Sequence, residues 1–334
     1  MIQHNIDLKP FNTFGISAVA ASFTEICSTE DLEHLSLKTT DNYLVLGGGS
    51  NILFTQNPGG LVLKINLKGI EVVKETDQYV YVKAAAGEIW HQFVLHAIQN
   101  NWGGIENLSL IPGSVGASPM QNIGAYGVEI KDVFEELEAY HIDTKEIHTF
   151  NAEECRFGYR ESVFKRHLKG RYIILSVTYR LTKNPIINTS YGAILSELEA
   201  MGVSQPTIKD VSDAVIRIRS SKLPDPKEIG NAGSFFKNPV IAVELFNSLK
   251  EKYPNIPSYP VSATEVKIPA GWLIEQDGWK GKTIDQYGVH KNQALVLVNY
   301  GNAKGHDIFN LSTQIIGSIK DHFGIELERE VNIV

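Results

Sequence analysis

Residues 42–54 read NYLVLGGGSNILF, so that three consecutive glycines separate two short apolar runs. The run Tyr43–Leu46 is short and ends at glycine, which is typical of a buried strand. The turn after it exposes backbone N–H groups, lets a ligand approach closely and adds two side-chain donors, which suits a pyrophosphate. Its residues are Gly47, Gly48, Gly49, Ser50 and Asn51. The stretch predicts strand, glycine turn and strand; a glycine-rich hairpin without a ligand is the alternative.

Two familiar phosphate-binding fingerprints do not fit this turn. Ile52 stands where the third glycine of a dinucleotide-binding fingerprint would be, and a strand rather than a helix is expected to follow. The lysine and hydroxyl residue that end a P-loop are also missing from the stretch. A different kind of nucleotide site is therefore needed.

The composition is that of a globular protein. The chain has 334 residues, enough for two or three domains, and 43% of them are hydrophobic against 21% charged. The net charge of −7 argues against a nucleic-acid partner. Two cysteines, Cys27 and Cys155, make neither a disulfide framework nor a metal site. With no signal peptide and no membrane-spanning run, we expect a cytoplasmic protein without membrane or metal partners.

The rest of the chain mixes both periodicities. We expect three strands over 59–87, with a hairpin tip at 76–78, a helix over 87–104, and strands over 134–150 and 171–181. A helix from 208 stops before Pro224. Helices over 242–253 and 305–324 flank a strand over 293–300. This pattern predicts an α+β protein with two mixed lobes and a third from about 224 to 323.

Residues 111–130, IPGSVGASPMQNIGAYGVEI, are too irregular for a core element and too apolar for a free loop. A segment that wraps a planar, hydrogen-bonding ligand has this character. An ordered Ω-loop without a ligand is the alternative.

A third motif, GNAGSFFKNP at 230–239, places one hydroxyl, Ser234, between a small flexible stretch and two phenylalanines. A glycine turn leading into a buried strand would also explain it. Elsewhere, Cys155 is expected to be a small buried hydrophobe. A lone His290 is expected to be structural.

Together these motifs resemble one family. They are NTFGI at 12–16, LGGGSNILF at 46–54, the 111–130 segment, CRFGYRESVFK at 155–165, RSSKLPDP at 219–226, GNAGSFFKNP, IPAGWLIEQDGWKG at 268–281, HKNQALVLVN at 290–299 and LEREV at 327–331. In this order they resemble the UDP-N-acetylenolpyruvoylglucosamine reductase (MurB) family of flavoenzymes. The short match NTSYGAILSELEA at 188–200 resembles the form whose tyrosine loop covers the substrate.

The resemblance implies an FAD-binding fold of the vanillyl-alcohol-oxidase (PCMH) type plus a C-terminal α+β substrate-binding domain. It implies lobe 1 at 1–70 with the tail 324–334, lobe 2 at 71–222 and the third domain at 223–323. It also implies NADPH-dependent reduction of UDP-N-acetylglucosamine enolpyruvate to UDP-N-acetylmuramate through non-covalent FAD, in peptidoglycan precursor synthesis. A monomer is expected.

The resemblance also implies site residues. The FAD would contact the glycine turn 47–51 together with Ile111, Pro112, Gly113, Ser114, Gly116, Ala117, Gln121, Asn122, Gly124, Ala125, Tyr126 and Arg219. The substrate would contact Tyr159, Tyr191, Lys222 and Asn238, the last three at its diphosphate.

Three residues would do chemistry. Arg160 would grip the substrate carboxylate as a planar fork, although an isolated arginine is more often a surface ion pair. Ser234 would donate a proton to the reduced carbon, and Glu330 would stabilise the enolate. Glu328 competes for that role, because in a strand both carboxylates would point to one face.

Two other functions remain open at this point. An FAD-dependent oxidase of the same fold would act on another small substrate, although neither 46–54 nor 111–130 has a His or Cys to tether FAD. A nucleotide-binding module without catalysis is the other alternative, and the presence of Arg160, Ser234 and Glu330 argues against it.

Overall fold

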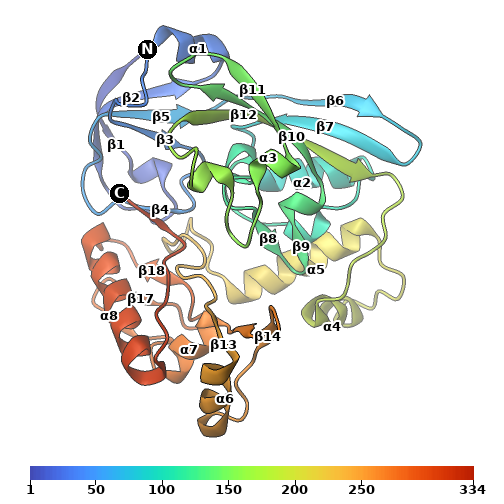
Figure 1. Ribbon diagram of the computed structural model, residues 1–334, viewed down its shortest axis with the longest axis vertical. Coiled ribbons are helices and arrows are strands. Elements are labelled where there is room, and N and C mark those ends of the chain that lie inside the picture. Colours follow the sequence, from blue (N-terminus) through green and yellow to red (C-terminus); the bar gives the residue numbers. More distant parts are fainter. The chain divides into compact units, whose positions relative to one another are not determined.

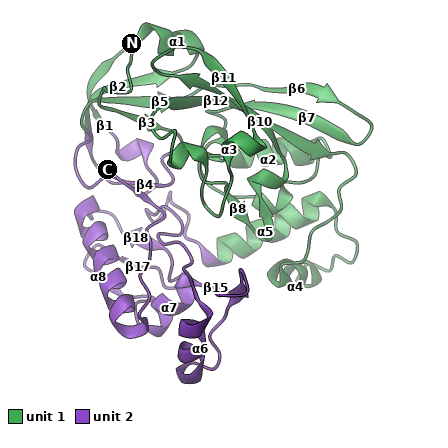
Figure 2. Ribbon diagram, in the orientation of Figure 1, with its two compact units in different colours: residues 1–6, 20–48, 59–221 green, residues 7–19, 49–58, 222–334 purple.

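The computed structural model describes all residues, 1–334, and divides them into two compact units (Figure 2). Unit 1 comprises Met1–Ile6, Ala20–Gly48 and Gly59–Ser221. Unit 2 comprises Asp7–Val19, Gly49–Pro58 and Lys222–Val334. The chain therefore enters unit 2 twice, through short segments, before its C-terminal third stays there.

One sheet of unit 1 is built around a central parallel strand. Its order is β1 (Gln3–Asp7), β2 (Val19–Ile26), β5 (Leu61–Ile65) and β3 (Tyr43–Leu46). β5 runs parallel to both of its neighbours and buries Val62 and Leu63, as expected for a strand covered on both faces. Helix α1 (Thr29–His34) begins at Ser28 with a capping box, so its first amide groups are satisfied.

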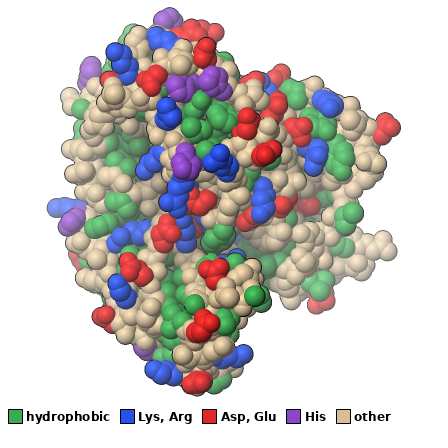
Figure 3. Space-filling model, in the orientation of Figure 1, with side chains coloured by type: hydrophobic (Ala, Val, Ile, Leu, Met, Phe, Trp, Pro, Cys, Tyr) green, Lys and Arg blue, Asp and Glu red, His purple; other side chains and the backbone are tan.

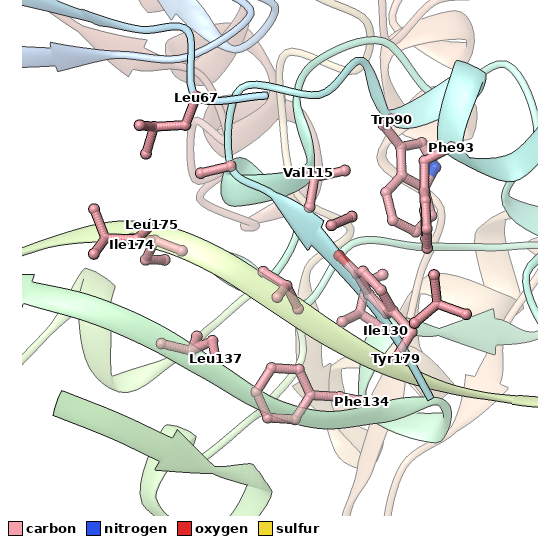
Figure 4. Packing of buried hydrophobic residues seen from close by; sticks show 14 of the residues in the cluster. Leu67, Trp90, Phe93, Val115, Ile130, Phe134, Leu137, Ile174, Leu175 and Tyr179 are labelled. Atoms are coloured by element: carbon pink, nitrogen blue, oxygen red, sulfur yellow. The ribbon is translucent and has the colours of Figure 1, made fainter. Parts of the chain in front are cut away.

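The second sheet of unit 1 is antiparallel and carries its main core (Figure 1). Its order is β11 (Ile147–Asn151), β10 (Phe134–His141), β12 (Tyr172–Thr182), β7 (Tyr79–Ala85) and β6 (Ile70–Glu75). Helix α2 (Trp90–Gln99) packs its apolar stripe against this core. The rings of Trp90, Phe93 and Tyr179 contact one another at centroid distances of 4.9–5.8 Å (Figure 4). The predicted hairpin at 76–78 and the helix within 87–104 are confirmed.

Further elements complete unit 1. They are β8 (Gly124–Ala125), β9 (Val128–Glu129), α3 (Ala152–Cys155), α4 (Gly192–Ala200) and α5 (Ile208–Lys222), whose last residue already belongs to unit 2. α4 and α5 share a small apolar cluster that includes Ile194, Leu198 and Val215. Cys155 is fully buried in the main core, as predicted.

Unit 2 has three small sheets. They are β4 (Ile52–Leu53) with β19 (Asn332–Ile333); β13 (Val240–Ala242), β15 (Glu265–Lys267) and β14 (Tyr259–Pro260); and β16 (Thr283–Ile284), β17 (Tyr287–Val289) and β18 (Leu297–Asn299). Its helices are α6 (Val243–Lys252), α7 (Ala270–Gln276) and α8 (Gly305–Phe323). The amphipathic α8 buries one side, and Gly324 in the left-handed region ends it.

The hairpin alternative for residues 42–54 is wrong. β3 and β4 are both present, but β3 pairs with β5 whereas β4 pairs in parallel with β19 at the C-terminus. The glycine turn therefore links two sheets instead of closing a hairpin. The division into two lobes and a third domain stays a prediction; the last boundary between the two units lies between Ser221 and Lys222.

The surface carries both signs of charge. Acidic and basic side chains are interspersed over the face shown in Figure 3. None of the helices combines the length and apolar character that a membrane crossing needs.

Candidate active site

The first half of the glycine turn lies against the 111–130 segment, backbone to backbone. A Cβ placed on Gly48 would lie 2.7 Å from the Cα of Gly113, and one on Gly47 would lie 2.7 Å from the Ser114 hydroxyl oxygen. Such distances leave no room for a side chain. Unit 1 thus joins two of the predicted cofactor segments through bare backbone, which is what close approach to a phosphate requires.

The second half of the turn belongs to unit 2. Gly49 has a φ of +64°, and a Cβ there would overlap the carbonyl oxygen of Phe11. The backbone oxygen of Asn51 accepts from the Asn332 N–H at 3.1 Å, and its Nδ2 donates to the carbonyl of Glu330 at 3.3 Å. Within unit 2 the turn is therefore tied to the segment that carries Glu330.

Lys64 in β5 contacts the glycine turn, a contact that was not predicted from the sequence. Its Nζ donates to the carbonyl of Gly47 at 2.5 Å, and burial, with Lys68 nearby, lowers its pKa. In a planar trans peptide the carbonyl and the following N–H point in opposite directions. Holding the Gly47 carbonyl therefore aims the Gly48 N–H away from Lys64. The signal in the sequence was one lysine inside the otherwise apolar strand LVLKI.

The start of the 111–130 segment is anchored to the end of β7 and the start of α2. Val115–Ala117 form a short 3-10 helix. The N–H groups of Val115 and Gly116 donate to the carbonyls of Glu88 and Ala86 at 2.8 and 2.9 Å. The predicted loop is thus a fixed part of unit 1.

Asn122 has a different environment from the one expected of a cofactor contact. It is fully buried, and its Nδ2 donates to the Glu129 carboxylate and to the Gly158 carbonyl, both at 3.1 Å. Its Oδ1 accepts the Lys131 N–H at 3.0 Å. The side chain therefore holds the segment before Arg160 against the β8–β9 turn. A contact with FAD stays a prediction.

Arg160 is positioned by the same turn. Its Nη2 donates to the carbonyl of Gly124 at 2.7 Å, and its guanidinium lies 5.4 Å from the ring centroid of Tyr159. Arg160 has a φ of 56°, Asn122 of 44° and Tyr126 of 51°. Non-glycine residues in the left-handed region cost about 1–3 kcal/mol each and gather at functional sites. Three of them among the predicted site residues mark this part of unit 1.

Tyr126 lies between Arg219 and Tyr191. Its side chain is hydrogen-bonded to Arg219, whose Nε also donates to the Leu110 carbonyl at 3.2 Å. Burial raises the pKa of Tyr126 and lowers that of Arg219. The rings of Tyr126 and Tyr191 meet edge to face at 5.2 Å. Unit 1 therefore brings these three predicted residues together.

In unit 2 a backbone hydrogen bond joins the segments that carry Ser234 and Glu330. The N–H of Glu330 donates to the carbonyl of Phe235, next to Ser234, at 2.9 Å. Phe235 and Phe236 are buried and in ring contact, whereas Ser234 is exposed. The aromatic pair predicted beside the hydroxyl thus anchors its backbone.

The two candidate carboxylates have different environments. Arg329, between them, forms an antiparallel bridge with Phe236, and the flanking N–H groups of Lys237 and Glu330 donate to the carbonyls of Glu328 and Phe235. That both carboxylates point to one face stays a prediction. Glu328 Oε1 lies 2.7 Å from Nζ of the buried Lys237, while Glu330 is half-buried. A structural ion pair thus occupies Glu328.

The remaining predicted substrate residues, Lys222 and Asn238, both belong to unit 2. Lys222 is exposed at the end of α5, and Asn238 Oδ1 accepts the N–H of Ala270 at the start of α7 at 2.9 Å. His290, expected to be structural, is buried, and burial, with Lys291 nearby, lowers its pKa.

The residues of unit 1 fit an FAD. A Cβ on Gly48 would meet the Gly113 backbone, so only bare backbone lets these two predicted phosphate-binding segments lie side by side. The half-buried Tyr126 and Arg219 add an aromatic face and a cation.

Comparison with known proteins agrees with this assignment. An FAD-binding-domain profile matches residues 31–150, and the profile of the UDP-N-acetylenolpyruvoylglucosamine reductase C-terminal domain matches residues 225–334. The reductase of Flavobacterium johnsoniae is 56% identical over 100% of this chain and 99% of its own. That of Amoebophilus asiaticus is 49% identical with the same coverage.

A solved structure shares the fold. The UDP-N-acetylenolpyruvylglucosamine reductase (MurB) of Thermus caldophilus superimposes with a TM-score of 0.71 at 23% identity, covering 100% of this chain and 98% of that one. The predicted fold class, an FAD-binding fold with a C-terminal α+β domain, is confirmed. The predicted cofactor and enzyme class, an FAD-dependent oxidoreductase, are confirmed as well. With about half of its residues identical to curated reductases over its whole length, the chain belongs to the UDP-N-acetylenolpyruvoylglucosamine reductase family.

Proposed function

We propose that this chain reduces the enolpyruvyl ether of UDP-N-acetylglucosamine enolpyruvate to UDP-N-acetylmuramate, with NADPH as reductant, in the synthesis of peptidoglycan precursors. Family membership over the entire chain is the observation that carries the proposal. The presence of Arg160, Ser234 and Glu330 supports it, because each is a residue type that the chemistry needs.

FAD would be held by the backbone of Gly47 and Gly48 and by the facing 113–117 segment, with Tyr126 and Arg219 at its periphery. When bound, it supplies the hydride that NADPH provides. The chain itself must then control the substrate carboxylate, the charge that develops beside it and the delivery of one proton.

Arg160 would hold the substrate carboxylate. Its guanidinium stays charged at every relevant pH and offers a planar pair of donors. One Nη2 bond to the Gly124 carbonyl and the neighbouring Tyr159 ring already fix its direction. This preorganisation removes a cost that a free arginine would incur on binding.

Ser234 would donate the proton to the carbon next to the carboxylate. A hydroxyl is a weak acid in water, so it can act only when it is fixed beside a very basic atom and shielded from solvent. Its side chain is exposed in the chain alone, so the bound cofactor and substrate would have to supply that shielding, while the buried Phe235 anchors its backbone. The hydroxyl is thus held in position while remaining outside the hydrophobic core.

Glu330 would stabilise the enolate as a hydrogen-bonding carboxyl group. Its half-buried position supports this role, and the Glu328–Lys237 pair removes the competing carboxylate. Tyr191, Lys222 and Asn238 would contact the substrate diphosphate. Lys222 would act as a flexible point charge.

The proposal includes a monomer in the cytoplasm. Both cysteines are free thiols, as in a reducing compartment. Size-exclusion chromatography with light scattering tests the monomer, and fractionation of the producing cell tests the compartment.

The visible spectrum of the anaerobic protein tests the function. NADPH should bleach the flavin bands, and UDP-N-acetylglucosamine enolpyruvate should then restore them. A flavin that stays reduced until air enters would contradict the proposed substrate and indicate an oxidase. A protein that binds no FAD would contradict the cofactor.

A further inference from the structure

Asn107 links two segments of unit 1 that carry predicted site residues. It lies in the 3-10 helix Glu106–Leu108 and is 1% exposed. Its Nδ2 donates to the carbonyl of Tyr126 at 3.0 Å and to the carbonyl of Asn188 at 3.1 Å. Both protons of one amide group are therefore used to hold the backbone of the 124–129 turn and the backbone of the loop before α4.

The loop that Asn107 holds leads directly to Tyr191. The side chain of Asn188 turns back on its own loop, where its Oδ1 accepts from the Ser190 N–H at 3.1 Å and from the Ser190 hydroxyl at 2.7 Å. Tyr191, 46% exposed, then presents its ring edge to face against Tyr126 at 5.2 Å. Asn107 thus holds the backbone on both sides of this ring contact.

The amide oxygen of Asn107 lowers the stability of the folded protein. Its Oδ1 is buried and has no hydrogen-bond partner. Flipping the amide would not help, since the oxygen would then face two carbonyl oxygens. A buried acceptor without a donor costs about 1–3 kcal/mol, a cost that an apolar side chain of this size would avoid. The two hydrogen bonds to the carbonyls of Tyr126 and Asn188 offset this cost.

We propose that Asn107 is a positioning residue for substrate binding, acting by fixing the Tyr191 loop against Tyr126. This rests on the proposed function, in which Tyr191 contacts the diphosphate of the UDP-sugar. With the loop held in place before substrate arrives, less ordering is required on binding. Asn107 itself touches neither the cofactor nor the substrate in this role.

The variant Asn107→Asp tests the proposal, because it keeps the shape and replaces the donor by an acceptor. We expect the KM for UDP-N-acetylglucosamine enolpyruvate to rise about tenfold, while kcat and the anaerobic reduction of FAD by NADPH change little. Val82→Ala, a core truncation in β7, is the control for lost stability and should leave that KM unchanged.

A double-mutant cycle separates positioning from general damage. If Asn107 acts through Tyr191, Asn107→Asp should add nothing to the KM of Tyr191→Ala. Fully additive effects, or an unchanged KM in Asn107→Asp, would overturn the proposal.

Hydrogen exchange followed by mass spectrometry provides a readout that does not depend on turnover. Peptides covering 186–194 should exchange faster in Asn107→Asp than in the wild type, and those of β12 should not. Equal exchange in the loop would overturn the proposal even in a protein that fails to use the substrate. A wild type that fails to turn over while its loop loosens in the variant would instead reject only the proposed function.

Discussion

The predicted cofactor cradle and the predicted substrate residues are built in opposite ways. In the cradle, Gly48 approaches Gly113 so closely that no side chain fits, and the nearby Asn122 is fully buried. Tyr159 and Tyr191 are 37% and 46% exposed, and Ser234 and Lys222 are exposed too. Closely packed backbone defines the first region, and exposed side chains define the second.

This difference indicates what each region tolerates. A change in the cradle alters packing, so it should affect cofactor affinity and folding together. A change at an exposed side chain leaves the fold intact, so its effect should appear only in the reaction. The variants below test that separation.

Ser234→Ala should have the largest effect. Without a positioned proton donor, we expect the return of the flavin bands after substrate addition to slow by about 10²–10⁴-fold. Reduction of FAD by NADPH and the melting temperature should stay near those of the wild type. Stopped-flow absorbance measures the two half-reactions separately, with Ser262→Ala, an exposed serine of unit 2, as control. Loss of the NADPH half-reaction would instead make Ser234 a nicotinamide-site or structural residue.

The two carboxylates near the C-terminus give a matched pair. Glu330→Gln should slow reoxidation by the substrate about 10²-fold, because it removes a group that stabilises developing charge. Glu328→Gln should change it less than about threefold, since its exposed carboxylate serves an ion pair with Lys237. Comparable losses in both variants would contradict the proposed separation of their roles.

Gly48→Ala should damage the cradle. The added methyl group would meet the Gly113 backbone, and we expect FAD binding to weaken by on the order of 10–100-fold. Titration of the deflavinated protein with FAD measures this affinity. Gly317→Ala in α8 is the matched control, because open space surrounds that position. Normal FAD affinity in Gly48→Ala would show that the cradle can open without cost.

Local patterns in the sequence predicted the elements well but not their partners. The strands expected over 59–87 and the apolar stripe of 87–104 correspond to β5, β6, β7 and α2, since each pattern is contained within its element. The pairing of β4 with β19 was missed, because strands so distant in sequence leave no local trace of each other. The bounds of an element are thus easier to predict than its neighbours.

The same limit applies to the site. The motifs identified the residue types, and family resemblance supplied their roles. Asn122 is an example. Its amide is hydrogen-bonded to Glu129, Gly158 and Lys131, but nothing in the sequence pattern distinguished it from a residue that faces a ligand. Lys237 likewise marks Glu328 as structural only once the fold brings them together.

The smallest predicted effect concerns the stability of unit 2, in which Asp277 lies. Burial acts to raise the pKa of Asp277, but hydrogen bonds from Ser318, His322 and Trp279 outweigh it and leave the pKa below its ordinary value. A carboxyl group with a lowered folded-state pKa contributes stability above its unfolded pKa, and this is lost as the pH falls through the folded value.

Asp277→Asn should therefore lower the melting temperature by a few degrees at pH 7, on the order of 2–4 °C per kcal/mol lost. The difference from the wild type should persist down to about pH 5 and shrink below about pH 4, near and below the unfolded pKa of an aspartate. Differential scanning fluorimetry from pH 3 to 8 measures it, with both half-reactions expected to be unchanged at pH 7. A difference that grew toward acid pH would mean that the carboxylate is destabilising where it stands.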